Sequence, residues 1–275
     1  MKNDIAYANA DFIPNAADYI DTWGDAAREF RETEAAIGRA RLNAAYGAHE
    51  REKLDLFHPA GRAQGLVVFV HGGYWHKFDR SYWSHFARGC TARGFAVAMP
   101  SYPLAPEARI TQITRSIARA VEKAASYVQG PIYLTGHSAG GHLVARMLCR
   151  DVAMQTEVRN RIARVVPISP LSDLRPFLDT TMNQTLRLDE AEAISESPLS
   201  HDPLPVPVTT WVGAEERPVF LDQARWLSEA WHRDMRIAPG RHHFDILDAL
   251  EDADSPLVRS IFRDPLDPER SSLDM

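Results

Sequence analysis

Short runs of apolar and β-branched residues recur along the chain, and helix-length segments separate most of them. Such runs are typical of buried strands, and we predict strands over residues 54–57, 66–70, 95–99, 132–135, 165–168, 208–212 and 235–238. Strands that alternate with helices predict right-handed crossovers and a mainly parallel sheet with helices on both faces. Ligands bind such sheets at the carboxyl ends of the strands, so the loops after strands are the first place to look for chemistry.

Two longer segments lie outside these strands. Residues 14–40 carry apolar side chains at steps of three and four with charged residues between them, which predicts an amphipathic helix ahead of the sheet. Residues 172–200 have no strand pattern and are long for a plain loop. We expect short helices there, forming a small helical cap over the carboxyl ends of the strands, although a purely structural packing role fits equally well.

Composition narrows the class of protein. At 275 residues with 45% apolar content, the chain can bury a large core, and we favour a single domain over residues 1–275. No stretch approaches 18 apolar residues and the first residues lack a signal-peptide pattern, so we expect no membrane span and a cytoplasmic protein. The net charge of -6 and the lack of a Lys or Arg block disfavour a nucleic acid partner. A small-molecule substrate fits this composition better. The sequence does not decide the oligomeric state, and a homodimer is one option.

The cysteines and histidines follow no metal-binding motif. Cys90 and Cys149 are isolated, each in a helix-like segment, so we expect buried apolar side chains rather than a redox pair or a metal cluster. The histidines are scattered along the chain. We therefore expect no metal.

A candidate nucleophile stands between a predicted strand and a helix-patterned stretch. Gly136-His137-Ser138-Ala139-Gly140 directly follows the strand predicted over residues 132–135. A strand that turns sharply into a helix leaves the side chain between them exposed on a strained backbone. Strand and helix converge there, so the residues two positions away on each side must be small, as Gly136 and Gly140 are. This pattern predicts that Ser138 is a nucleophile.

A serine hydroxyl is a weak nucleophile at neutral pH and needs a base, which in turn needs an acid to orient it. In hydrolases with this kind of serine turn, the acid and then the histidine follow the serine along the chain. For the acid, the turn after the strand at 208–212 offers Glu216 first and Glu215 next, with Asp173 as an outsider after another strand. For the base, the turn after the strand at 235–238 favours His243 over His242.

A second motif, His71-Gly72-Gly73-Tyr74-Trp75, ends the strand predicted over residues 66–70. Its glycines let backbone N–H groups approach the negative charge that develops on a reacting carbonyl oxygen. We expect the N–H groups of Gly73 and Tyr74, with that of Ala139, to form an oxyanion hole, and Gly72 to permit the turn. His71 is expected to brace the loop rather than to transfer protons.

Aromatic residues crowd the same region, and core packing accounts for about half of them. The others could line an apolar pocket for a ring. We predict substrate contacts at Tyr74, Trp75, Tyr102 and His142.

Several motifs resemble those of the kynurenine formamidases (arylformamidases), relatives of the hormone-sensitive-lipase-like esterases. Residues 71–75 look like that family's HGGxW motif, and further family-like segments are 54–59, 102–106, 136–143, 172–176, 197–199, 212–220 and 243–246. The resemblance implies an α/β-hydrolase fold, no metal or organic cofactor, and conversion of N-formylkynurenine to kynurenine and formate. The family's acid is usually Asp where this chain has Glu216, and the His-Phe-Asp match supports His243 as the base.

Two other functions stay in view. A carboxylesterase or thioesterase acting on short acyl chains would use the same nucleophile and oxyanion hole, and would differ only in the shape of its pocket. A non-catalytic ligand-binding protein could use the same scaffold, but an intact serine, acid and histidine set argues against it.

Overall fold

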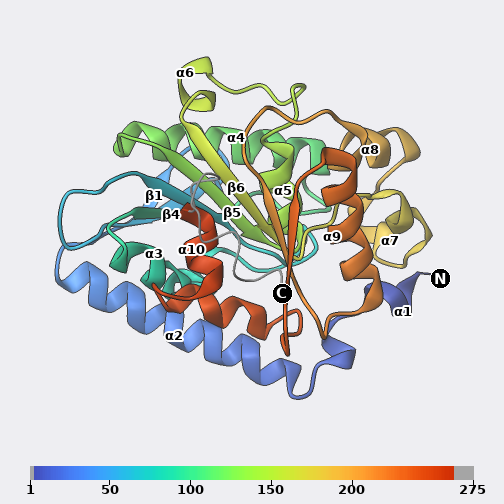
Figure 1. The fold of residues 1–275 in the computed structure, drawn as a ribbon, viewed down its shortest axis with the longest axis horizontal. Coiled ribbons are helices and arrows are strands. Elements are labelled where there is room, and N and C mark those ends of the chain that lie inside the picture. Colours follow the sequence, from blue (N-terminus) through green and yellow to red (C-terminus); the bar gives the residue numbers. More distant parts are fainter. Residues whose placement is uncertain (1–2, 263–275) are drawn as a thin grey trace, which may run out of the picture.

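In residues 3–262, which the computed structural model describes, an eight-stranded sheet has the order β1-β2-β4-β3-β5-β6-β7-β8 (Figure 1). The strands are β1 (Ala40–Ala45), β2 (Lys53–Phe57), β3 (Leu66–Val70), β4 (Ala96–Pro100), β5 (Ile132–His137), β6 (Ile162–Ile168), β7 (Thr209–Gly213) and β8 (Asp234–Ala238). β1 pairs antiparallel with β2, and β2 with β4, whereas every pair across the sheet from β4 to β8 is parallel. The mainly parallel sheet predicted from the sequence is confirmed.

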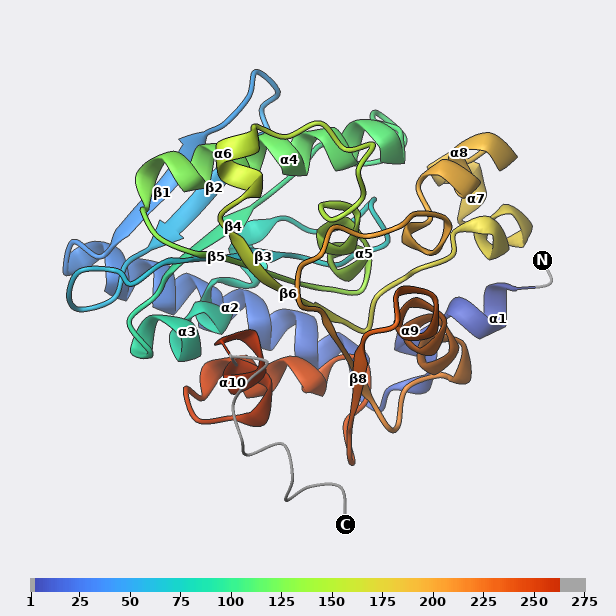
Figure 2. The same cartoon turned by 45° about the horizontal axis from the view of Figure 1, so that its top comes forward.

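Helices cover both faces of the sheet (Figures 1 and 2). The α-helices are α1 (Asp4–Tyr7), α2 (Ala16–Ala36), α3 (Arg88–Ala92), α4 (Ile110–Tyr127), α5 (Ala139–Arg146), α6 (Thr156–Arg159), α7 (Asn183–Leu186), α8 (Glu190–Ser195), α9 (Pro218–Trp231) and α10 (Pro256–Phe262). Alternate residues of β3 enter opposite cores, Val68 on the face of α4, α5 and α9 and Phe69 on the face of α2, α3 and α10. Burial on both faces explains why β3 is a continuous apolar run.

The N-terminal helix is shorter than predicted, and a strand was missed. α2 ends at Ala36 rather than near residue 40, because the chain turns at Gly38, whose φ of +71° favours glycine. β1 follows and was not predicted. It is an edge strand that alternates between half-buried and exposed residues, and its alanine, arginine and leucine side chains have no strand preference.

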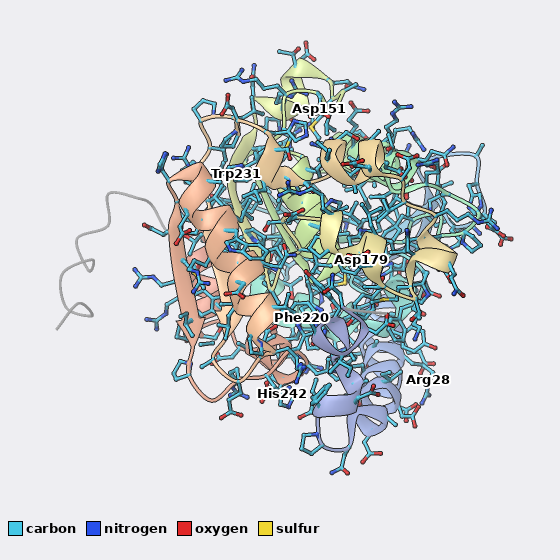
Figure 3. The ribbon with its side chains drawn as sticks, turned by 90° about the vertical axis from the view of Figure 1, so that its right-hand side faces the viewer. Arg28, Asp151, Asp179, Phe220, Trp231 and His242 are labelled. Atoms are coloured by element: carbon cyan, nitrogen blue, oxygen red, sulfur yellow. The ribbon has the colours of Figure 1, made fainter. Side chains whose placement is uncertain are left out.

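The cap region holds short helices, as expected. Residues 172–200 form the 3-10 helix η4 (Arg175–Asp179), then α7 and α8, and then η5 (Pro198–Ser200). Asp179 of η4 and Phe220 of α9 lie on the same side of the molecule as the blue N-terminal helices (Figure 3). The ring of Tyr7 packs on Phe177 of η4 and on Phe220 of α9, so three segments far apart in the sequence meet there. Within residues 3–262, no helix combines the length and the apolar character that crossing a membrane requires.

Candidate active site

Ser138 occupies a sharp turn between β5 and α5. Its backbone has φ 56° and ψ -116°, a conformation that costs about 1–3 kcal/mol for a residue with a side chain. The turn leaves no room for larger neighbours, because a Cβ atom on Gly140 would lie 2.0 Å from the carbonyl oxygen of Val70, and one on Gly136 would lie 2.5 Å from that of Gly140. A hydrogen bond of 2.9 Å from the Ser138 N–H to the carbonyl of Ile168 fixes the turn to β6.

A buried acid and histidine face each other next to this turn. Nδ1 of His243 lies 2.6 Å from Oε2 of Glu216, and both side chains are buried. The carboxylate's other oxygen accepts hydrogen bonds from the N–H of Gly213 (2.8 Å) and from the hydroxyl of Ser169 (2.5 Å). A carboxylate only accepts, so neutral His243 carries its proton on Nδ1, which leaves Nε2 free to take a proton.

The competing residues lie elsewhere. Glu215 is exposed, and Asp173 is paired with the guanidinium of Arg175 (2.6 Å). Nδ1 of His242 accepts backbone N–H groups of its own turn, and its Nε2 meets the hydroxyl of Tyr19 at 3.2 Å. Of the alternatives that the sequence left open, the structure brings Glu216 and His243 together.

His137 ties the histidine turn to the serine turn. Its Nε2 donates to the carbonyl oxygen of His243 (2.8 Å), and the two rings lie 4.5 Å apart. Burial holds the pKa of His137 well below its usual value, so this ring stays neutral. The sequence singled out neither His137 nor Ser169 for a role at the site, although His137 is the last residue of β5 and Ser169 directly follows β6, at the sheet edge where functional residues are expected.

The loop after β3 presents backbone N–H groups to the same region. Gly73, Tyr74 and Trp75 have consecutive positive φ angles of 111°, 51° and 59°. Gly72 lies against the serine turn, because a Cβ atom there would stand 3.2 Å from Cβ of Ser138. Among residues 3–262, no hydrogen bond uses the N–H of Gly73, Tyr74 or Ala139. In the described part of the chain these three N–H groups thus lack a protein partner, as the predicted oxyanion hole requires.

Three of the four side chains predicted to contact substrate lie in the core. Trp75, Tyr102 and His142 are fully buried, and their polar atoms already have protein partners. Nε1 of Trp75 donates to Nδ1 of His142 (3.2 Å), whose Nε2 donates to the carbonyl of Glu196 (2.7 Å). The hydroxyl of Tyr102 donates to the carbonyl of His71 (3.0 Å). These side chains support the loop after β3, and their contact with a substrate stays a prediction.

The other buried histidine of the loop also acts as a support. Nδ1 of His71 donates to the carbonyl of Gly72 (2.7 Å), and its ring stacks on Tyr102 with centroids 4.4 Å apart. Burial lowers the pKa of His71 to about 4 and that of His142 to about 3. Both rings therefore stay neutral at physiological pH.

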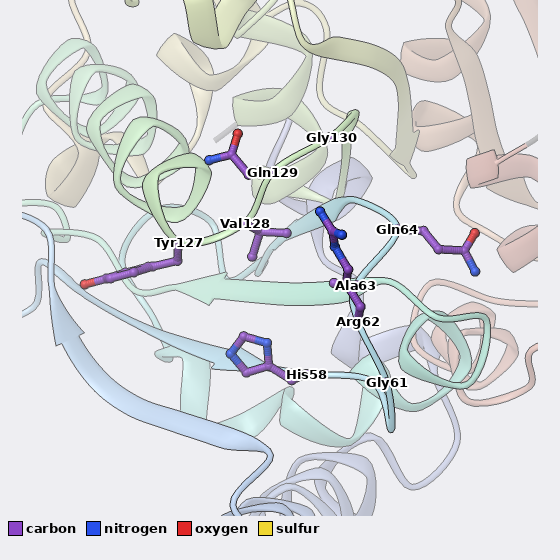
Figure 4. Close-up of a pocket in the computed structure, with 9 residues that line it drawn as sticks. All are labelled: His58, Gly61, Arg62, Ala63, Gln64, Tyr127, Val128, Gln129 and Gly130. Carbon is purple, nitrogen blue, oxygen red and sulfur yellow. The ribbon is translucent and has the colours of Figure 1, made fainter.

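One cavity lies at the opposite end of the sheet, with a volume of about 620 Å³ (Figure 4). Its residues border the starts of β3 and β5, whereas Ser138 follows the carboxyl end of β5. They are His58, Gly61, Arg62, Ala63, Gln64, Tyr127, Val128, Gln129 and Gly130. No predicted site residue lines this cavity.

Three residues of metal-binding type lie close together around Cys149, where the sequence predicted no such cluster. Ligand-type atoms of Cys149, Asp151 and His201 lie within 4.8 Å of one another, although the sequence indicated no cluster at either cysteine. The guanidinium of Arg146 already binds both oxygens of Asp151, at 2.6 and 3.1 Å. The guanidinium of Arg146 thus already neutralises the carboxylate of Asp151 that a metal ion would need as a ligand.

Comparison with known proteins agrees with this arrangement. A model of the alpha/beta hydrolase fold matches residues 67–230, which is more than half of the chain and includes both the serine turn and the acid. The chain belongs to the alpha/beta hydrolase fold family. The hydrolase activity predicted from the sequence is therefore confirmed at the level of the family.

Proteins similar to this hydrolase are named for different activities. The kynurenine formamidase of Salmo salar is 28% identical over 267 residues, which are 90% of each chain. A crystal structure from Silicibacter sp., named as a candidate thioesterase, is 53% identical with a TM-score of 0.93, and covers 96% of this chain and 100% of its own. Esterase B of Lactobacillus rhamnosis has a TM-score of 0.65 at 18% identity, covering 89% of this chain and 92% of its own, which shows the shared fold alone.

Proposed function

We propose that this hydrolase removes a small acyl group, formyl, from an aromatic amine, as in the conversion of N-formylkynurenine to kynurenine and formate. One observation carries the chemistry: the buried Glu216–His243 pair, with its 2.6 Å hydrogen bond, lies beside the strained turn of Ser138 and the open N–H groups of the loop after β3. The likeness to kynurenine formamidases along most of both chains supports the formyl group and the aromatic amine.

In the first half of the reaction, Oγ of Ser138 attacks the formyl carbon, and Nε2 of His243 takes the hydroxyl proton. The carbonyl oxygen becomes an oxyanion, which the N–H groups of Gly73, Tyr74 and Ala139 stabilise. Glu216 holds the ring in the tautomer that leaves Nε2 free, and its negative charge stabilises the imidazolium. The three hydrogen bonds on this carboxylate keep it in place.

In the second half, the imidazolium gives its proton to the departing amine nitrogen, the C–N bond breaks, and a formyl ester remains on Ser138. Water then attacks this ester with His243 again acting as the base, and formate leaves. Each step uses side chains and backbone groups of this chain.

A second candidate is cleavage of short acyl esters or thioesters, which the 53% identical candidate thioesterase supports. Esters and thioesters react through the same kind of acyl-enzyme. Their leaving groups depart more easily than an amine, so they depend less on the proton that the imidazolium of His243 donates. The leaving group therefore distinguishes the two candidates.

The test compares kcat/KM for N-formylkynurenine, phenyl acetate and a short acyl thioester in one buffer. We expect N-formylkynurenine to be the best of the three. A preference for the ester or the thioester by several orders of magnitude would overturn the formamidase proposal and favour the second candidate. Ser138→Ala is the control, and it should lose at least about 10⁴-fold of kcat on every substrate that the wild type cleaves.

Two further points are largely independent of this proposal: a cytoplasmic location, which we predict, and the oligomeric state, which the sequence leaves open with a homodimer among the options. Sedimentation at micromolar concentration checks the second.

A binding protein without catalysis would show no turnover of any acyl substrate by the wild type.

A further inference from the structure

The loop after β3 stores backbone strain that something must hold. Tyr74 and Trp75 both have left-handed backbone angles, at φ 51° and 59°, and neither is a glycine. Each costs of order 1–2 kcal/mol and persists only where the surroundings fix it. Trp75 is held by His142, which belongs to α5. Tyr74 must be held by something else.

The hydroxyl of Tyr74 is bound to the beginning of the chain. It donates to the carbonyl oxygen of Tyr7 (2.6 Å) and accepts from Nδ2 of Asn9 (3.0 Å). Asn9 is 4% exposed, so this contact is shielded from water. Burial raises the pKa of Tyr74 above its usual value, so the hydroxyl keeps the proton that it donates.

Residues 3–12, which we name the N-terminal clasp, are themselves anchored at several points. Tyr7 is 1% exposed, packs on Phe177 with centroids 4.5 Å apart, and accepts from Nε2 of Gln223 (2.8 Å). Nη2 of Arg217, the residue after Glu216, donates to the carbonyl of Ile5 (3.0 Å). The clasp thus joins the cap region, α9 and the turn of the acid to one side chain of the oxyanion loop.

We propose that the N-terminal clasp positions the oxyanion hole: by holding the hydroxyl of Tyr74, it fixes the backbone N–H groups of Gly73 and Tyr74 toward the reacting carbonyl. Tyr74 and Asn9 are then positioning residues, which act through the backbone and not by touching the substrate. This inference rests on the proposed oxyanion hole. It also assigns a catalytic role to the hydrogen bond between Asn9 and Tyr74, which lie 65 residues apart in the chain.

The test removes the hydroxyl of Tyr74 and keeps its ring and its N–H. Tyr74→Phe should lower kcat about tenfold and change KM less than threefold, because loosening a donor costs less than the 10²–10³-fold loss from deleting one. Binding of a trifluoromethyl ketone, which forms an oxyanion on the enzyme, should weaken by about the same factor as kcat/KM. Tyr46→Phe is the matched control, because its half-buried hydroxyl also bonds a carbonyl (Ser101, 2.5 Å) but lies outside the site.

A second variant guards against a purely structural loss. Asn9→Ala should also lower kcat, by about threefold, because it removes one of the two hydrogen bonds of the Tyr74 hydroxyl. The double variant should fall little below Tyr74→Phe, because Tyr74→Phe already loses the bond to Asn9. Tyr46→Phe should lower Tm without changing kcat more than twofold. The proposal is overturned if Tyr74→Phe keeps kcat within twofold of the wild type, if ketone affinity does not follow kcat/KM, or if the two losses multiply in the double variant.

The assay uses whichever acyl substrate the wild type cleaves best. If that substrate is an ester, the formamidase proposal has failed while the clasp is still tested. If Ser138→Ala keeps its turnover, the catalytic assignment has failed whatever Tyr74→Phe does.

Discussion

The serine turn and the loop after β3 face the same reacting carbon but are built in different ways. The serine turn is fixed by backbone groups: a Cβ atom on Gly136 or Gly140 would meet a backbone carbonyl oxygen, and the N–H of Ser138 bonds to the carbonyl of Ile168. The oxyanion loop is fixed by side chains that reach distant segments. Tyr74 bonds to Asn9, and Trp75 bonds to His142.

This difference has a physical consequence. A turn held by steric exclusion cannot adjust to a larger side chain by a small shift. A substitution there should therefore cost most of the stability or activity that the turn supports. A loop held by side-chain hydrogen bonds, each worth about 0.5–1.5 kcal/mol, can loosen by degrees when one of them is removed. We therefore expect large losses from the serine and acid side, and graded ones from the loop.

The largest effect is expected at the acid. Glu216→Gln keeps the shape but removes the charge that orients and stabilises the ring of His243, so kcat should fall about 10³–10⁴-fold. Glu215→Gln, in the same turn but exposed, should stay within twofold. Steady-state kinetics of the pair measure this, and equal losses in the two variants would refute the assignment of the acid.

The next effect concerns the serine turn. Gly140→Ala would place a methyl group 2.0 Å from the carbonyl oxygen of Val70, where neither backbone can yield, so the free energy of unfolding should fall by at least about 3 kcal/mol. Gly61→Ala is the control, because a Cβ atom there meets nothing within 4 Å, and it should change stability by less than about 0.5 kcal/mol. Urea denaturation measures both; a Gly140→Ala protein of normal stability and activity would contradict a sterically fixed turn.

The last prediction concerns the response of three buried histidines of the site to acid. His71, His137 and His142 have folded pKa values below the usual 6.5 because they are buried, so the folded protein binds fewer protons than the unfolded chain. Their stabilisation is complete above about pH 6.5 and is lost as the pH falls below it, by up to about 1.4 kcal/mol per pH unit for each ring. Urea denaturation at pH 7.5, 6.5 and 5.5 should show this slope, and a free energy that is constant down to pH 5.5 would contradict neutral buried rings.

The same contrast explains what the sequence could predict. The serine turn, seven of the eight strands and the turns that carry Glu216 and His243 each follow a pattern of residues close together in the chain, and the sequence predicted them as structure. The support of the loop by Tyr7, Asn9 and His142 depends on contacts between distant segments, which no local pattern carries. For that reason Trp75, Tyr102 and His142 were expected at a substrate and are found in the core. β1 was missed for a related reason, since an edge strand of alanine and arginine gains its structure from its partner.

The most direct test of the central claim is covalent titration of the nucleophile. A fluorophosphonate should react once per chain, and peptide mass spectrometry should find the added mass on Ser138. Hydrolysis of N-formylkynurenine should fall in proportion to labelling and reach zero at one label per chain. Turnover that survives complete labelling, or a label on another residue that accounts for the loss, would contradict Ser138 as the nucleophile of this hydrolase.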